Sequence, residues 1–532
     1  MTEQHPKSST INVRQAMDLA IEHHQAGRLA EAETLYRQIL NLHPHHAHAL
    51  HLLGIIARQV EKLEDAAQLM SRAVEVDSMV AIYHNNLGVV LLALGKHDAA
   101  IACFQNAMKL QPYYPEAHSN LILVLLVHRD SNPQIITEEL KRWSNRYAAP
   151  LKPLIIPHVK PDLHHDPERR LKVGYVSADF RENVSDAFLD PLLRNQDHNQ
   201  FEIFIYAQVA EADSFTRQFR SYADRWCDIF EVADQLVAEQ IRRDQIDILV
   251  DLKLHTNGNR LPVFAYKPAP IQMTWLGYPG STGLETIDYR LTDPYLDPPG
   301  SNDPSYIEES IRLPDCFWCY DPLIREPAVN SLPALTNGYV TFGSLNHFSK
   351  LNDRMLEIWA RVLAAVPDSR LLILAPQGEA QHRVMRKLEQ ENIVQTRLKF
   401  VDRQPRITYF KLYHQIDLAL DTLPYNGHTT NLDAFWMGVP VVTLTGGTVV
   451  GRAGWSQLCN LGLPELAAQT PEEYIKIAIS LAGDLPRLSE LRSTLRQRME
   501  SSPLMDAKQF TRNIEVVYRN IWRKWCAAEP KK

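Results

Sequence analysis

In its C-terminal third the chain reads Ile416-Asp-Leu-Ala-Leu-Asp421-Thr-Leu-Pro-Tyr-Asn-Gly-His428-Thr429-Thr430-Asn-Leu-Asp433-Ala-Phe-Trp-Met-Gly-Val-Pro440. This pattern predicts a buried strand, a short polar turn, and a helix whose first turn carries His428, Thr429 and Thr430. The start of a helix has unpaired backbone N–H groups and partial positive charge, so it favours phosphate. Asp433, one helical turn on, can accept hydrogen bonds from a ribose. The stretch therefore predicts a nucleotide-diphosphate site.

Strand-length apolar runs alternate with helical stretches, such as Met355–Val366, after residue 170. The runs are Leu171–Asp179, Phe201–Ala207, Ile246–Asp251 and Pro270–Leu276, and then Tyr339–Leu345, Arg370–Ala375, Lys399–Val401, Ile416–Leu420 and Val439–Leu444. Such alternation predicts parallel sheets covered by helices on both faces. We expect two Rossmann-like lobes, 171–330 and 331–532, and the second holds the nucleotide site and ends in a helix. Ligands of such sheets bind beyond the carboxyl ends of the strands.

The N-terminal quarter contains an internal repeat. Small residues recur at a step of 34 residues in two series, Ala20, Gly54 and Gly88, and Ala32, Ala66 and Ala100. This period, with small residues inside each helix pair, is the tetratricopeptide signature. We expect an α-solenoid over 1–127, with units at about 13–46, 47–80 and 81–114 and a further helix over Glu116–Val127, and then a proline-rich linker, 128–170, that contains His164-His165.

The concave face of such an array usually binds peptide or protein. Three repeats make only a short groove. The array can therefore dock an acceptor protein, or it can join two copies of the chain as a homodimer, and the sequence leaves both alternatives open.

Composition excludes several classes of protein. The chain has 532 residues, 45% of them hydrophobic and 22% charged, with a net charge of −7, which argues against a nucleic-acid or membrane-surface binder. No apolar run reaches the roughly 18–20 residues of a membrane span, and the polar Met1–Thr10 does not resemble a signal peptide. Cys316-Phe-Trp-Cys319 has no second ligand pair nearby, so we expect it to pack beside a strand. These features predict a cytoplasmic protein.

Several nucleotide and metal motifs are missing. No Gly-x-Gly-x-x-Gly follows the run 171–179, and neither a Walker A sequence nor an Asp-x-Asp pair occurs. The site at 426–433 would then neutralise a diphosphate with the helix dipole, hydroxyls and cationic side chains. We therefore expect no metal and no cofactor.

Several motifs resemble one family. They are Val173-Gly-Tyr-Val-Ser-Ala-Asp-Phe180, Pro268-Ala-Pro-Ile-Gln-Met-Thr-Trp-Leu-Gly-Tyr-Pro-Gly280, Asn346 with Lys350, Asn426-Gly-His-Thr-Thr430 with Asp433, and Ser501-Ser-Pro-Leu504. Over about 13–525 the chain resembles the SPINDLY-like bacterial O-linked N-acetylglucosamine transferases, which join tetratricopeptide repeats to a two-lobed GT-B region. The resemblance implies transfer of a sugar, N-acetylglucosamine above all, from a UDP-sugar to Ser or Thr hydroxyls of proteins. It also implies inversion at the sugar and no requirement for metal.

The resemblance further implies roles for individual side chains. Lys350 and His428 are the catalytic candidates, with the Lys350 ammonium stabilising the leaving UDP. The donor contacts are implied at Asn346, His347, Gln404, Arg406, Tyr409, His428, Thr429, Thr430 and Asp433. The sugar and acceptor side is implied at Asp179, Leu254, His255, Thr256, Tyr278, Pro279 and Gly280. For His255-Thr256 a purely structural loop is the alternative, and for Tyr278-Pro279-Gly280 a rigid turn.

Two positions depart from the family pattern. The Asp-Phe-x-x-His motif reads Asp179-Phe-Arg-Glu-Asn183, and asparagine cannot take up a proton at neutral pH. The Asp-Leu-x-Gly-His-Thr pattern has Leu254 at the glycine, where a bulky side chain can crowd the sugar. The general base therefore stays unassigned. A weakly active or inactive UDP-binding scaffold built on the repeats is the alternative to an enzyme.

Overall fold

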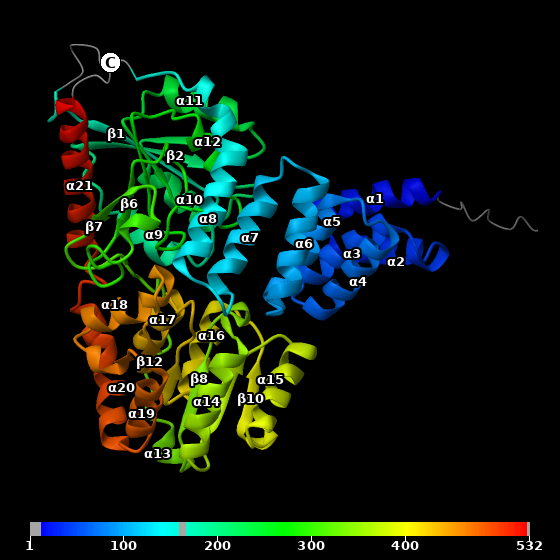
Figure 1. The fold of residues 1–532 in the computed structure, drawn as a ribbon, viewed down its shortest axis with the longest axis vertical. Helices are drawn as coiled ribbons and strands as arrows, with labels where there is room; N and C mark the ends of the chain where they lie inside the picture. The colour runs from blue at the N-terminus through cyan, green and yellow to red at the C-terminus, as the bar shows by residue number, and fades with distance from the viewer. Residues whose placement is uncertain (1–11, 159–165, 529–532) are drawn as a thin grey trace, which may run out of the picture.

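The computed structural model describes residues 12–158 and 166–528 (Figure 1). The predicted polar segment Met1–Thr10 and the pair His164-His165 lie outside the described residues. The N-terminal helices are α1 (Val13–Gln25), α2 (Leu29–Leu42), α3 (Ala47–Gln59), α4 (Leu63–Val76), α5 (Ala81–Ala93), α6 (His97–Leu110) and α7 (Pro115–Val127). Their first six members form three successive helix pairs, and the predicted α-solenoid is confirmed.

The repeated small residues lie where the helices cross. Ala20, Ala32 and Ala66 are fully buried. A Cβ atom on Gly54 would lie 2.7 Å from Met70 Cγ, and one on Gly88 would lie 2.7 Å from a ring carbon of Phe104. Larger side chains at these positions would push the paired helices apart, which explains the period of the pattern.

The predicted linker 128–170 contains regular structure. Helix α8 (Pro133–Trp143) continues into a π-helical turn, η1 (Ser144–Ala148), and a 3-10 helix, η2 (Ala149–Leu154). Trp143 is fully buried, and its Nε1 donates to the Pro115 carbonyl at 3.2 Å. Pro133 occupies the first helical turn, where proline is tolerated, so its presence does not indicate a loop. Helix α8 thus continues the array and also packs on the first lobe, where Thr137 Oγ1 donates to the Ser305 carbonyl at 3.0 Å.

The first lobe is built on a seven-stranded parallel sheet of order β3-β2-β1-β4-β5-β6-β7. Its strands are β1 (Leu171–Ser177), β2 (Phe201–Ala207), β3 (Arg225–Asp228), β4 (Ile248–Asp251), β5 (Ile271–Thr274), β6 (Tyr289–Thr292) and β7 (Glu309–Arg312). Its helices are α9 (Asp186–Leu193), α10 (Ser214–Tyr222), α11 (Asp234–Arg243) and α12 (Leu261–Ala265).

The second lobe has a six-stranded parallel sheet of order β10-β9-β8-β11-β12-β13. Its strands are β8 (Thr341–Ser344), β9 (Arg370–Leu374), β10 (Leu398–Val401), β11 (Leu418–Leu420), β12 (Val441–Leu444) and β13 (Ala467–Ala468). Its helices are α13 (Ala334–Asn337), α14 (Asp353–Ala365), α15 (Glu379–Gln390), α16 (Arg406–Leu412), α17 (Thr429–Trp436), α18 (Ala453–Asn460), α19 (Pro471–Ala482) and α20 (Leu485–Glu500). The predicted pair of Rossmann-like lobes is confirmed.

The last helix, α21 (Ala507–Ala527), crosses back to the first lobe, where it lies beside β7 and β1 (Figure 1). Tyr518 Oη lies 2.9 Å from Tyr175 Oη of β1, and Arg519 donates to the Arg169 carbonyl at 2.8 Å. The C-terminal helix predicted for the second lobe therefore packs on the first. Sequence order gave no sign of this because both lobes offer apolar faces to an amphipathic helix.

The helix array contacts both lobes. Ser119 Oγ of α7 lies 3.0 Å from His255 Nδ1 in the first lobe. His97 Nε2 of α6 lies 2.7 Å from the Ser349 carbonyl oxygen in the second lobe. The array is thus packed against both lobes instead of extending freely from them.

Candidate active site

The predicted strand, turn and helix are present as β11, residues 421–428 and α17, with His428 at the N-cap. Asp421 directly follows β11 and is 1% exposed. Its carboxylate accepts hydrogen bonds from Gly427 N at 2.6 Å, Thr443 Oγ1 at 2.7 Å and Asn431 Nδ2 at 2.8 Å. Asp421 therefore fixes the turn to the sheet and to α17. We had assigned it no role, although a carboxylate that ends a buried strand is a signal for one.

The neighbouring strand β8 brings a second segment to the same edge. Asn346 follows β8 and donates from Nδ2 to Asp421 at 3.3 Å. His347 is exposed and caps the 3-10 turn η4 (Phe348–Lys350) by accepting from Ser349 N. The two predicted donor segments thus meet where parallel strands end, as expected for open α/β sheets.

Lys350 contacts the turn itself. Its ammonium donates to the Asn426 carbonyl at 2.8 Å and lies 4.2 Å from the centre of the Tyr425 ring. Burial lowers the pKa of Lys350 to about 8, and the nearby Asp421 carboxylate opposes this shift. The Lys350 ammonium is thereby held against Asn426, which lies two residues before His428 and the start of α17.

His428 is held between two aromatic rings. The centre of its ring lies 4.8 Å from that of Tyr425 and 5.8 Å from that of Trp318, and its Nε2 lies 3.3 Å from the Val450 carbonyl oxygen. Burial lowers its pKa to about 3, and the nearby Lys350 charge adds to this effect. His428 is therefore a neutral imidazole at pH 7, suited to hydrogen bonding and unsuited to acting as a general base. Thr429 and Thr430 are half-buried beside it in the first turn of α17.

Asp433 is paired with Arg406. The guanidinium donates to both carboxylate oxygens, at 2.7 and 2.6 Å, and Tyr320 Oη donates to one of them at 2.6 Å. Asp433 is 2% exposed. A ribose bound here would share these oxygens with Arg406, so the implied ribose contact stays a prediction. The pair itself anchors α16 to α17.

The rest of the implied uridine-binding stretch lies along α16. Tyr409 Oη lies 2.8 Å from Tyr413 Oη, and Tyr413 donates to the Thr430 carbonyl at 3.0 Å. Gln404 is half-buried just before α16. Tyr409 is therefore linked through one hydroxyl to the first turn of α17, which carries the threonine pair.

The first lobe presents Asp179 after the end of β1. Its carboxylate accepts from Lys253 Nζ at 2.7 Å and from Ser185 Oγ at 2.8 Å. Lys253 follows β4, so this ion pair joins two neighbouring strand ends. The side chains at 179 and 253 are 17% and 9% exposed, which leaves little of either open to solvent.

Asn183 closes the loop after β1. Its Nδ2 donates to the carbonyls of Asp179 at 2.8 Å and Arg181 at 2.7 Å, and its Oδ1 accepts from Ser185 N at 2.6 Å. Its backbone N–H donates to Asp186, whose pKa burial raises to about 8. The Asn183 amide is thus fully used in shaping the loop.

Leu254 adopts a left-handed backbone, with φ of 45°, where glycine is favoured. Its side chain is 1% exposed and lies in the hydrophobic core. A Cβ atom on Gly277 would come within 3.2 Å of Leu254 Cδ1. Leu254 therefore accepts backbone strain and directs its side chain into packing. The crowding of the sugar by Leu254 stays a prediction.

The turn Tyr278-Pro279-Gly280 is tight. Gly280 N donates to the Tyr278 carbonyl at 2.8 Å, and Arg290 Nε donates to the Gly280 carbonyl at 3.2 Å. A Cβ atom on Gly280 would lie 2.4 Å from the Tyr278 ring. This geometry agrees with the alternative of a rigid turn.

The pattern of glycosyl transferase family 41 matches residues 155–324 and 328–514, which is more than half of the chain. The chain belongs to glycosyl transferase family 41. Tetratricopeptide repeats are matched at 17–78 and 81–114. The predicted family and repeats are thereby confirmed.

Relatives in this family carry informative names. A Petunia hybrida protein named as a probable UDP-N-acetylglucosamine–peptide N-acetylglucosaminyltransferase SPINDLY is 39% identical over 430 residues, 79% of this chain and 45% of its own. The SPINDLY protein of Arabidopsis thaliana, similarly named, is 37% identical over 432 residues, 79% of this chain and 46% of its own. The chain thus spans less than half the length of these curated relatives.

A solved structure matches nearly the whole chain. It is a lysine-to-methionine variant of the Thermobaculum terrenum O-GlcNAc transferase, with 37% identity and a TM-score of 0.89. The match covers 98% of this chain and 99% of that one. The family 41 architecture therefore includes the helix array in its present position.

The implied site residue His255 lies where the array meets the first lobe, and its role stays a prediction. His255, implied on the sugar and acceptor side, is fully buried, with Nδ1 3.0 Å from Ser119 Oγ and Nε2 2.9 Å from the Thr282 carbonyl. Burial lowers its pKa to about 3. Both ring nitrogens have protein partners, so His255 joins the array to the first lobe. Thr256 Oγ1 donates to the Lys253 carbonyl at 2.6 Å, which agrees with a structural loop.

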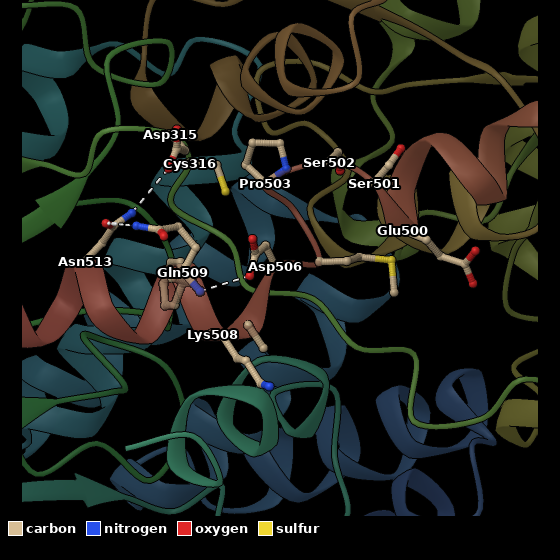
Figure 2. A pocket seen from close by; sticks show the side chains of 13 residues that line it. Asp315, Cys316, Glu500, Ser501, Ser502, Pro503, Asp506, Lys508, Gln509 and Asn513 are labelled. Carbon is tan, nitrogen blue, oxygen red and sulfur yellow. Dashed lines mark hydrogen bonds between the residues drawn. The ribbon is translucent and has the colours of Figure 1, made fainter. Parts of the chain in front are cut away.

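The motif Ser501-Ser-Pro-Leu504 lies where the chain leaves α20 for α21. Ser501, Ser502 and Pro503 of the motif line a surface pocket of about 610 Å³, together with Asp315, Cys316 and Asn513 (Figure 2). The Leu504 carbonyl accepts from Tyr320 N at 2.7 Å, and Tyr320 in turn bonds Asp433. The family 41 motif therefore supports the donor half indirectly. The pocket lining contains none of the implied site residues.

Within 12–158 and 166–528, no group of three or more His, Cys, Asp or Glu side chains is arranged to hold a metal ion. In those ranges no helix combines the length and apolarity needed to cross a bilayer.

Proposed function

We propose that this chain transfers N-acetylglucosamine from UDP-N-acetylglucosamine to Ser or Thr hydroxyls of proteins. The observation that carries the proposal is the position of Lys350, whose ammonium binds the turn that leads into His428 and α17. A cation, an uncharged imidazole and a helix N-terminus at one place suit a diphosphate leaving group. The names of the family 41 relatives supply the sugar and the acceptor class.

In the proposed reaction the acceptor oxygen attacks the anomeric carbon while the bond from that carbon to the UDP oxygen breaks. Attack from the face opposite UDP inverts the anomeric carbon. The Lys350 ammonium and the N–H groups of α17 stabilise the charge that develops on the diphosphate. The hydroxyl proton leaves to a donor phosphate oxygen or to water, since Asn183 has no basic nitrogen and His428 is too weakly basic. The site residues require no metal for these roles.

The proposal is tested by incubating the full chain with labelled UDP-N-acetylglucosamine and protein or peptide acceptors, with and without EDTA. We expect label on Ser or Thr and release of UDP, both unaffected by EDTA. UDP binding without transfer to any acceptor would favour the scaffold alternative. Transfer only from another nucleotide sugar would change the donor and keep the reaction class.

The proposal also covers where the acceptor binds, where in the cell the protein works, and whether it forms a homodimer. We place the acceptor protein along the concave face of the repeats, because helices α6 and α7 of the array contact the two lobes. Cys103, Cys227, Cys316, Cys319 and Cys459 are unbridged thiols, which suits a reducing, cytoplasmic setting. Homodimerisation through the repeats stays a prediction, which sedimentation of the full chain would measure.

The pKa of Lys350 predicts an alkaline limit. Below about pH 8 the group is the charged ammonium, and above it the charge is lost. We expect kcat/KM for the donor to fall about tenfold per pH unit well above pH 8, because this parameter follows the free enzyme. Lys350→Arg, which stays charged, should lack this limb in whatever activity it retains. An unchanged alkaline limb in Lys350→Arg would assign the titration to another group.

Asn183→His restores the residue implied by the family but should not restore a base. The asparagine amide makes three hydrogen bonds that shape the loop, and imidazole cannot reproduce their geometry. We expect kcat to fall by about 3- to 10-fold, as for a misplaced loop near a site. The measurement is kcat across pH 6–9, with Arg181→Ala as a control in the same loop. A rise in kcat with a new acid limb near pH 6–7 would show instead that the asparagine had weakened the enzyme.

A further inference from the structure

The third repeat touches the turn that carries Lys350. His97 is the first residue of α6 and is 9% exposed. Its Nε2 lies 2.7 Å from the carbonyl oxygen of Ser349, the residue before Lys350, in a buried contact that spans 252 positions of sequence. A residue of the repeat array therefore reaches the peptide next to the proposed catalytic lysine.

Arg383 of α15 forms hydrogen bonds on both sides of the same contact. Its guanidinium donates to the Gly95 carbonyl of the array at 3.0 Å and to the Leu351 carbonyl, just beyond the turn, at 3.2 Å. Phe348, the first residue of the turn, is buried, and a Cβ atom on Gly95 would lie 3.3 Å from its ring. The turn Phe348–Lys350 is thus packed against the array on one side. On its other side, Lys350 binds the Asn426 carbonyl.

The chemistry of His97 suits a fixed donor. Burial lowers its pKa, and the hydrogen bond to Ser349 opposes the shift. The titratable side chains around it are His128, Arg383 and Asp98. A neutral imidazole that carries its proton on Nε2 donates to the carbonyl and holds the turn at one distance from α6. Without that donor the buried carbonyl is unpaired and the turn is free to shift.

We infer that His97 is a positioning residue for Lys350, so that the third tetratricopeptide repeat completes the donor site. The inference rests on the proposed function for the role of Lys350. It assigns the array a task beyond holding an acceptor, because the array sets where the ammonium meets the diphosphate. Displacement of such a group by about 1 Å can lower a rate about 100-fold.

The first experiment compares His97→Leu and His97→Gln in the full chain. His97→Leu keeps bulk and removes the donor, and we expect kcat to fall by about 10- to 100-fold with KM for the acceptor little changed. His97→Gln restores an N–H donor and should recover most of the rate. The matched control is His84→Leu, since His84 Nε2 makes the same kind of contact, 2.9 Å from the Ser78 carbonyl, within the repeats. Equal losses in His84→Leu and His97→Leu, or no loss in His97→Leu, would overturn the inference.

The second experiment is a double-mutant cycle on UDP affinity. Lys350→Met and His97→Leu should each weaken UDP binding, and the double variant should bind about as Lys350→Met does, because His97 acts through Lys350. Additive losses would show that His97 only stabilises the fold and would overturn the inference. The cycle needs no turnover, so it tests the positioning role even where the wild-type chain transfers no sugar. That absence of transfer would contradict only the proposed function.

Discussion

Replacing Lys350 by methionine is expected to lower kcat for sugar transfer by about 100- to 1,000-fold, the usual cost of removing one charge-stabilising donor. Methionine keeps much of the length of the side chain and removes the ammonium. In the wild-type chain that ammonium is 2.8 Å from the Asn426 carbonyl, beside the predicted diphosphate site. Charge on the diphosphate grows as the sugar bond breaks, so the loss should appear more in kcat than in KM. Steady-state rates with labelled donor measure both.

Lys411→Met is the matched control for this prediction. Lys411 lies on α16 in the same lobe and is exposed, with its side chain on a helix that carries the implied uridine contacts. We expect its kcat within about twofold of wild type, as for most surface substitutions. Comparable losses in the two variants would mean that Lys350 matters for general stability and not for the leaving group.

The donor half of the site was predictable because its signals are local. A buried strand, a polar turn and a capped helix are adjacent in sequence. The stretch Ile416–Pro440 alone is therefore enough to predict this local structure. Lys350 follows β8, the neighbouring strand of the sheet, and the ends of parallel strands gather at one edge. The family resemblance, not this rule, implied that residues following β1, β4 and β5 form the sugar and acceptor side, which stays a prediction.

The remaining features depend on contacts between distant segments. His255 had the spacing of a site residue, yet its partner is Ser119 of α7, 136 positions away. The short strands β3 and β7 lie at the two edges of their sheet and are partly exposed, so they lack a continuous apolar run. Helix α21 is amphipathic, and it packs on the first lobe through contacts such as that of Tyr518 with Tyr175. No pattern within a single segment records these pairings.

The two halves of the proposed site are of different character. The donor half is held by buried polar groups, Asp421 and the pair of Arg406 with Asp433. The opposite wall is held by turns, in which Asn183, Leu254 and Gly280 serve the backbone. The departures from the family pattern at Asn183 and Leu254 therefore alter the geometry of these loops. Any effect on sugar transfer follows from that altered geometry.

Asp421→Asn should remove donor binding while leaving the second lobe folded. The carboxylate accepts from Gly427, Asn431 and Thr443, and the amide of asparagine would place an N–H group against at least one of these donors. We expect a loss of roughly 2–4 kcal/mol in the free energy of unfolding, from buried donors left unpaired. UDP affinity should fall by about 30- to 100-fold, because the turn no longer sets His428 and α17 relative to Lys350. Thermal unfolding and calorimetric titration with UDP measure the two effects.

Asp417→Asn is the control that separates a loss of folding stability from a loss of UDP binding. Asp417 precedes the same strand, is fully buried, and accepts from Ala334 N and Thr341 N, both at 2.8 Å. Its substitution should destabilise the lobe by a similar amount, since buried backbone donors again lose a partner. Its partners lie at the opposite end of β11 from the turn, so UDP affinity should stay within about threefold of wild type. If the two variants lose UDP affinity equally, the turn has no special dependence on Asp421, and the helix start alone accounts for the site.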